Sequence, residues 1–175
     1  MKNLVVGVLL ALLWNTSAIA VELRTGDRAD DFSLKDSLGK EYTLNSPELK
    51  GRVLYFNYAD PSSKDMNKHV DDALKSDPGL DRKRSYAGLG IANMKASLLP
   101  DFAIERVIKR KQKETGATIL LDNNYIILNS WGLKNNVSNV VVLDKERICR
   151  YIYKGKLPAA EVEKLINTIK EYQVK

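Results

Sequence analysis

Residues 53–67, with the sequence VLYFNYADPSSKDMN, decide the fold. The first six form a continuous apolar run, which is typical of a strand covered on both faces. Ser62 fits a helix N-cap, and Asp65, three residues later, fits its capping-box partner. The positions that follow share one apolar helical face, made by Met66, Val70, Ala73 and Leu74. This stretch therefore predicts a strand, a tight turn and an amphipathic helix in succession.

The rest of the chain continues this alternation. We expect further strands at residues 86–92, 118–121, 140–143 and 148–153. Helices are expected from Pro100 to a stop at Gly116, and from Pro158 onward. The first of these helices has a predicted apolar face made by Ile104, Val107 and Ile108. This order predicts one α/β domain, a thioredoxin-like mixed β-sheet flanked by helices.

Residues 1–20 have the pattern of a secretory signal peptide. Lys2 gives a positive start, residues 4–14 form a short apolar core, and residues 18–20 supply the small side chains of a cleavage site. The apolar core is shorter than the roughly 20 residues that span a bilayer, so an uncleaved anchor is the lesser alternative. Cleavage after Ala20 leaves one domain, residues 21–175, exported and not stably inserted in a membrane.

The composition limits the chemistry that the chain can perform. Its 175 residues include one Cys and one His, which excludes an internal disulfide, a Cys-x-x-Cys pair and a cysteine-rich zinc site. We therefore expect no metal and no cofactor. The 28 Lys and Arg against 22 Asp and Glu give a net charge of +6, which attracts acidic partners mildly. Export from the cytoplasm disfavours nucleic acid as a partner.

Several segments resemble known families. GDRADDFSLKD (26–36) and GRVLYFNY (51–58) are similar to the opening of the peroxiredoxin and thiol-disulfide oxidoreductase branch of the thioredoxin superfamily. ADPSSKDMN (59–67), WGL (131–133) and VVVLDK (140–145) resemble the small periplasmic YtfJ-type family more closely. The resemblance implies a thioredoxin-like fold in the periplasm of a Gram-negative bacterium. It implies no activity, because none is established for that family.

The reaction centre of the superfamily is missing from this sequence. Active relatives carry Cys-x-x-Cys between the first interior strand and its helix, where the helix N-terminus makes a thiolate available. Residues 59–62, ADPS, occupy that turn here. Relatives also place a cis-proline just before the strand that here begins near Val140, and Ser138 or Asn139 stands there instead. Alanine has no nucleophile, and a serine hydroxyl without a positioned base does not form an anion comparable to a thiolate, so we predict a redox-inactive protein.

Two single residues are the remaining candidates for chemistry. Cys149 lies in the predicted strand at residues 148–153 and is interpreted as a small buried strand residue. A disulfide-linked dimer through Cys149 is the first alternative, because an unpaired thiol in an oxidising compartment can pair with a second chain. His69 lies at the edge of the apolar helix face, about 10 Å along the axis from Ser62, which is too far for it to act as a base on that hydroxyl.

Two basic clusters are the strongest charge features. They are residues 82–84, RKR, and Arg106 with residues 109–113, KRKQK. The second cluster lies opposite the apolar face of its helix, so a solvated helical face explains it. Attraction to anionic lipid or lipopolysaccharide is the alternative interpretation.

Two functions of different classes follow. The favoured one is a redox-inactive module that binds a protein or peptide partner where its relatives hold extended polypeptide. Its predicted surface, with Ser63 and Ser138 exposed, consists of Asp60, Pro61, Ser62, Ser63, Val137, Ser138 and Asn139. The alternative is an enzyme: a one-cysteine peroxidase or reductase that uses Cys149, or a less familiar chemistry in the turn at residues 60–63.

Overall fold

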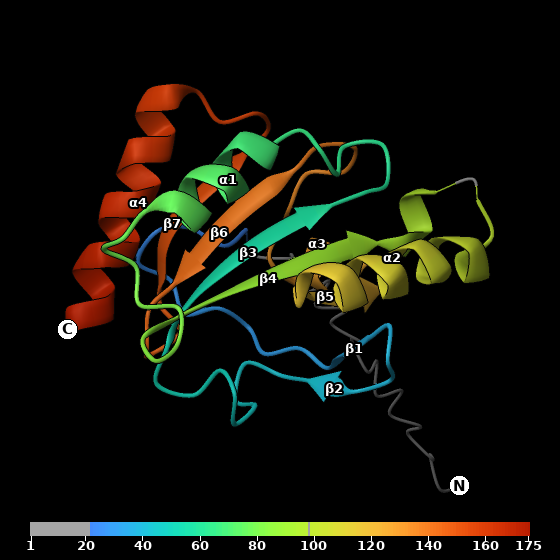
Figure 1. Ribbon diagram of the computed structural model, residues 1–175, viewed down its shortest axis with the longest axis horizontal. Coiled ribbons are helices and arrows are strands. Elements are labelled where there is room, and N and C mark those ends of the chain that lie inside the picture. Colours follow the sequence, from blue (N-terminus) through green and yellow to red (C-terminus); the bar gives the residue numbers. More distant parts are fainter. Residues whose placement is uncertain (1–21, 98) are drawn as a thin grey trace, which may run out of the picture.

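The computed structural model describes residues 22–97 and 99–175, so the predicted signal peptide lies outside the described residues. Seven strands form one mixed sheet: β1 (Leu34–Asp36), β2 (Glu41–Tyr42), β3 (Val53–Ala59), β4 (Tyr86–Asn93), β5 (Thr118–Asp122), β6 (Asn139–Leu143) and β7 (Cys149–Lys154). Their order across the sheet is β2-β1-β5-β4-β3-β6-β7 (Figure 1). The predicted thioredoxin-like α/β fold is confirmed.

Three parallel strands form the centre of the sheet. β4 pairs in parallel with β3 on one side and with β5 on the other, whereas β6 and β1 join this centre antiparallel. β3 is buried along its length except at Asn57, which is half-buried. Burial on both faces explains why a continuous apolar run, rather than an alternating one, encodes this strand. Because the three strands are parallel, their carboxyl ends meet at one edge of the sheet.

Helices cover one face of the sheet, and a helix with irregular chain covers the other. The helical segments are α1 (Lys68–Ser76), η1 (Met94–Ala96), α2 (Asp101–Thr115), α3 (Ile126–Ser130) and α4 (Ala159–Val174). α1 and α4 pack over β3, β6 and β7, and α2 packs over β4 and β5 (Figure 1). On the opposite face Trp131 meets Phe32 and Phe56 edge to face, at centroid distances of 6.1 and 5.4 Å. None of the described helices combines the length and the apolar character that crossing a bilayer requires.

α2 keeps its predicted C-terminal stop but not its whole predicted apolar face. Gly116 ends the helix at φ 67°, a left-handed conformation that glycine adopts without steric cost. Ile104 and Ile108 are buried, whereas Val107 is 52% exposed, so its predicted place in the core is wrong. The buried face turns toward Gln112 instead, one turn beyond Ile108.

A buried arginine ties the β2–β3 connection to the β6–β7 hairpin. The guanidinium of Arg147 donates to the carbonyl oxygens of Leu44 and Arg52 at 3.0 Å and of Leu49 at 2.8 Å. Burial lowers the pKa of this guanidinium. The three carbonyl contacts satisfy a charged group that is only 5% exposed.

The N-terminal segment covers the outer edge of the sheet at the start of β7. The N–H of Gly26 donates to the carbonyl of Cys149, and the N–H of Cys149 donates to the carbonyl of Asp27, each at 2.8 Å. Arg28 and Ile148 form an antiparallel bridge in the same segment. The chain that follows the predicted cleavage site is therefore part of the sheet.

Candidate binding site at the carboxyl edge

The two predicted segments of the candidate site lie side by side. Tyr58 pairs with Asn139 in the antiparallel register between β3 and β6. Residues 60–63 continue from the end of β3, and residues 137–138 lead into β6, so both segments lie at the carboxyl edge of the parallel strands (Figure 1). The structure thus brings together the segments that the sequence predicted to converge.

Asp60 holds the turn that stands in the place of Cys-x-x-Cys. Its Oδ1 accepts the backbone N–H of Ser63 at 2.8 Å and the hydroxyl of Ser62 at 2.7 Å. The prediction that Ser62 is a helix N-cap is therefore wrong, because its hydroxyl donates instead of accepting. A carboxylate is the stronger acceptor and takes the free N–H of the turn. Turns continue from there, and α1 begins only at Lys68.

Asn67, which the sequence did not single out, joins several segments behind this turn. Its Nδ2 donates to Ser138 Oγ at 2.8 Å and to the carbonyl of Gly155 at 2.9 Å. Its Oδ1 accepts the N–H of Leu157 at 2.9 Å. The hydroxyl of Ser138 then donates to Oδ1 of Asn57, 2.7 Å away. These buried polar groups are satisfied within the chain, which fixes the turn against β6 and the β7–α4 connection.

Several residues of the predicted surface are buried. Ser63 is 4% exposed and Ser138 is 0% exposed, so the prediction that both are exposed is wrong. Their hydroxyls face inward to Asp60 and to the Asn67 network. Asp60 and Asn139 are buried as well, at 2% and 0%. These four side chains pack inside the carboxyl edge and are not accessible to solvent.

Three residues of the prediction remain accessible. Ser62 is exposed, and Pro61 and Val137 are half-buried. We call these three residues the carboxyl-edge surface. Ile126, 38% exposed at the start of α3, follows the end of β5 at the same edge of the sheet.

Buried polar groups line the ends of the parallel strands. The hydroxyl of Tyr58 donates to Oδ2 of Asp122 at 3.2 Å. Burial, followed by the charge of Asp122, raises the pKa of Tyr58 above its usual range, so the phenol stays protonated. Within the described residues, Oδ2 of Asp60 and Oδ1 of Asn93 are buried without a hydrogen-bond donor. Asn93 and Asp122 were not predicted from the sequence, although each is the polar residue that closes a parallel strand.

The only cysteine of the sequence lies outside this site. Cys149 is 0% exposed at the start of β7, and burial raises the pKa of its thiol to about 11. Its interpretation as a buried strand residue is confirmed. A buried thiol with a raised pKa is poorly placed for attack at neutral pH and for pairing with a second chain.

His69 has a structural contact in the first turn of α1. The ring is on an exposed residue, and its Nε2 donates to the carbonyl of Leu157 at 2.9 Å. This bond joins α1 to the β7–α4 connection. The helix-edge interpretation of His69 fits this position.

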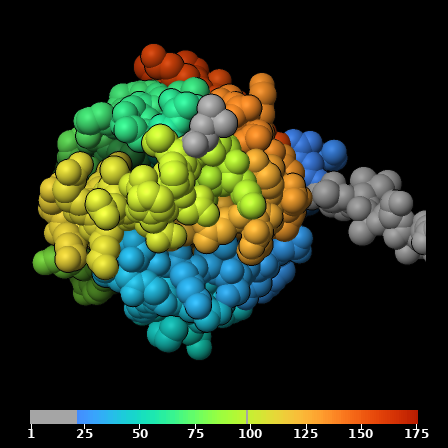
Figure 2. All heavy atoms as spheres, turned by 90° about the vertical axis from the view of Figure 1, so that its right-hand side faces the viewer, coloured from blue at the N-terminus to red at the C-terminus, as the bar shows by residue number. Residues whose placement is uncertain are grey.

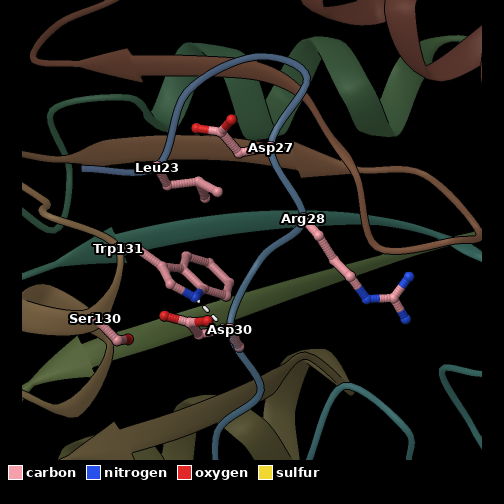
Figure 3. A pocket seen from close by; sticks show the side chains of 6 residues that line it. All are labelled: Leu23, Asp27, Arg28, Asp30, Ser130 and Trp131. Atoms are coloured by element: carbon pink, nitrogen blue, oxygen red, sulfur yellow. Dashed lines mark hydrogen bonds between the residues drawn. The ribbon is translucent and has the colours of Figure 1, made fainter. Parts of the chain in front are cut away.

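Neither of the two hollows that we describe is lined by a residue of the candidate site. One, of about 130 Å³, is bordered by Leu23, Asp27, Arg28, Asp30, Ser130 and Trp131 (Figure 3). There the indole N–H of Trp131 donates to the carbonyl of Asp30 at 3.0 Å. The other, of about 290 Å³, lies beside Arg147. In the described part of the chain, no three His, Cys, Asp or Glu side chains lie together as a metal site requires.

Comparison with known proteins gives a family and a fold. The model of a family described as "Bacterial protein of unknown function (YtfJ_HI0045)" matches residues 25–172. The uncharacterized protein YtfJ of Escherichia coli is 27% identical over 175 residues, 93% of this chain and 94% of that protein. An uncharacterized protein of Haemophilus influenzae is 26% identical over 128 residues, 71% of this chain and 68% of that protein. The solved structure of a candidate protein disulfide isomerase from Bacteroides thetaiotaomicron matches with a TM-score of 0.64 at 22% identity, over 87% of this chain and 92% of that one. Likeness at this identity demonstrates the fold alone.

Proposed function

Because this chain belongs to the YtfJ_HI0045 family of bacterial proteins, whose function is unknown, and has a thioredoxin-like fold, we propose that it is an exported, redox-inactive binding protein. In this proposal the carboxyl-edge surface holds an extended stretch of a periplasmic protein or peptide. No thiol and no cofactor takes part.

The observation that carries the proposal is the construction of the turn after β3. Ala59 and Ser62 stand where active relatives have cysteines, and Asp60 closes the turn through two hydrogen bonds. The segment before β6 is bonded to the same region through Ser138. Hydrogen bonds thus keep both segments ordered, although the groups that exchange disulfides are replaced. This combination favours binding over dithiol chemistry.

The carboxyl-edge surface has the chemistry that an extended polypeptide requires. Pro61 and Val137 offer small apolar contacts, and the hydroxyl of exposed Ser62 offers a polar one. Extended peptides bind sheet-based scaffolds through main-chain hydrogen bonds combined with small side-chain contacts of this kind. Ile126 adds an apolar side chain at the same edge.

The alternative is a thiol enzyme that uses Cys149. The complete burial of this side chain and its thiol pKa of about 11 argue against it, because a nucleophilic cysteine must be accessible and ionised. We expect no insulin-reductase, disulfide-isomerase or peroxidase rate above buffer. A peroxidase rate that disappears in Cys149→Ser would replace the binding proposal with the one-cysteine enzyme.

Site-specific photo-crosslinking in living cells tests the binding proposal. A benzophenone amino acid is placed at Ser62, at Val137 or at Ser76, an exposed serine at the other end of α1 that serves as the matched control. We expect adducts to the same periplasmic protein from positions 62 and 137, and none from position 76. Equal adducts from all three positions, or none from 62 and 137 in cells that contain the folded protein, would contradict the proposal.

A further inference from the structure

The outer side of α2 carries an unusual distribution of charge. Five of its residues fall within an arc of about 100° around the helix axis: Phe102, Arg106, Lys109, Arg110 and Lys113. No acidic residue lies in this arc, because the three acids of the helix, Asp101, Glu105 and Glu114, project on either side of it. The arc lies opposite the face that packs on the sheet.

The cations of this arc are exposed and mostly free of carboxylate partners. Arg106, Lys109 and Lys113 have no carboxylate oxygen within 4.0 Å among residues 22–97 and 99–175. Arg110 makes one contact, to Glu114, at the limit of 4.0 Å. The yellow atoms of α2 stand on the molecular surface between the green atoms around α1 and the blue atoms of the β1–β2 region (Figure 2). The positive charge of the arc therefore faces solvent.

Two large apolar side chains are exposed at the start of α2 and just before it. Phe102 is 66% exposed and Leu99, three residues earlier, is 61% exposed. A solvated helical face explains the cations but leaves these two side chains unexplained. Interfacial helices bind lipid by combining Lys and Arg on a polar face with Trp, Phe or Leu on an apolar face. The apolar face of α2 packs on the sheet, so exposed Phe102 and Leu99 are the apolar groups that remain for a lipid surface.

We propose that the outer face of α2, made by Phe102, Arg106, Lys109, Arg110 and Lys113 and here called the α2 face, docks on an anionic lipid surface together with Leu99, which lies just before the helix. The inference goes beyond the proposed binding function and does not depend on it. Each Lys or Arg close to an anionic membrane strengthens binding roughly fivefold. Leu99 and Phe102 would enter the interface at one end of the helix.

The shape of the α2 face favours lipid over an acidic protein. The face is one convex helix of 15 residues, about 22 Å long, with cations spread along it. No residue of the α2 face lines either of the two hollows described above. Diffuse charge on a convex surface suits mobile lipid headgroups, whereas a specific carboxylate partner is usually held by paired donors in a fixed geometry. The test must therefore distinguish binding to an anionic lipid surface from binding to an acidic polypeptide.

Vesicle sedimentation with the protein purified after export tests the proposal. We expect binding to vesicles of equal parts phosphatidylglycerol and phosphatidylcholine, weakening steeply as ionic strength rises from about 0.05 M to about 0.5 M, and little binding to pure phosphatidylcholine. Lys109→Glu with Lys113→Glu should weaken binding at least about 25-fold. The matched control, Lys83→Glu with Lys156→Glu, changes the net charge equally at exposed sites and should weaken it less than about fivefold.

A spectroscopic variant locates the contact. Phe102→Trp places an exposed indole on the α2 face, while Trp131, the other tryptophan of residues 21–175, is buried and is expected to change little on lipid binding. Its emission should shift to the blue with anionic vesicles only. Equal losses in the two charge variants, or no shift at position 102, would overturn the proposal. Binding to polyglutamate but not to vesicles would also overturn it and would assign the α2 face to an acidic polypeptide.

Discussion

Nδ2 of Asn67 donates a hydrogen bond to Oγ of Ser138 across 2.8 Å, joining residues 71 positions apart in the chain. Both side chains are 0% exposed. The segment after β3 and the segment before β6 form the candidate site, and this buried hydrogen bond fixes them together with the pairing of Tyr58 and Asn139. The stability of this edge therefore depends on a residue just outside the predicted surface.

Asn67→Ala should lower the free energy of unfolding by about 3 kcal/mol, because it removes the acceptor of the Leu157 N–H and the donor to Ser138 Oγ in a buried region, where that hydroxyl then keeps only its bond to Asn57. Urea unfolding measures the loss. Asn124→Ala, at an exposed asparagine, is the control and should change stability by less than about 0.5 kcal/mol. Equal effects of the two changes would mean that the network contributes nothing.

Asp60→Ala should lower the free energy of unfolding by about 1–2 kcal/mol, because it removes the oxygen that accepts the N–H of Ser63 in the turn. Ser62→Ala should lower it by less than about 0.5 kcal/mol, since Ser62 is exposed and Oδ1 of Asp60 keeps its bond to the N–H of Ser63. Thermal unfolding of both variants decides the matter. A larger cost for Ser62→Ala than for Asp60→Ala would restore the serine as the cap.

The buried thiol of Cys149 should make the protein less stable in alkali. Its pKa is raised from 9.0 to about 11 by burial, so between these values the unfolded chain loses a proton that the folded chain keeps. The unfolded state then binds fewer protons, and stability falls as pH rises, by at most about 1.4 kcal/mol per pH unit. Below pH 9 this contribution is fully present.

Cys149→Ser is the comparison that isolates this effect. Tyrosines with raised pKa values titrate in both proteins and cancel in the difference. Urea unfolding at about pH 8 and about pH 10.5 should show that the free energy of unfolding falls less between these pH values in the variant than in the native protein. Parallel slopes for the two proteins, or rapid labelling of the native thiol near neutral pH, would refute the assignment of Cys149 as buried and un-ionised.

Gly132→Ala should be more destabilising than Gly116→Ala. Both glycines have positive φ, 56° and 67°, so alanine is strained by about 1 kcal/mol at each. At Gly132 an added Cβ would also lie 2.9 Å from the backbone Cα of Glu22, whereas at Gly116 nothing lies within 4 Å. Melting temperatures of the two variants should differ accordingly. Equal melting temperatures would mean that the backbone at Glu22 moves away from the added Cβ without measurable cost.

The exported protein should begin at Val21, because Ala18 and Ala20 occupy the positions at which signal peptidase requires small residues. Intact mass of the protein recovered from the periplasm measures this. A recovered protein that retained residues 1–20 would contradict cleavage and favour a protein tethered to the membrane by an uncleaved anchor.

Much of the fold could be predicted because its strongest patterns are local. The apolar run of β3 and the helix stop at Gly116 depend on residues close in sequence, and both are confirmed. β1 and β2, of three and two residues, are too short to leave a periodic pattern, and the sequence did not predict them.

The side chains of the candidate site were harder to predict than its location. Ser63 and Ser138 have small polar side chains of the kind expected at a surface, yet their hydroxyls bond inward. Their burial is caused by Asp60, three residues before Ser63, and by Asn67, 71 positions before Ser138. Hydrogen bonds between distant residues leave no periodicity, so a single sequence did not reveal them.

The N-terminal segment along β7 also bears on self-association. A strand edge with free N–H and C=O groups is a template on which another chain can add a strand and begin an aggregate. Gly26 and Asp27 occupy those groups on Cys149, while the far edge of the sheet is β2, only two residues long. We expect that a protease that removed the chain through Ala29 would uncover the start of β7 and promote self-association. Loss of the residues just after the predicted signal peptide should therefore make the protein more prone to self-association.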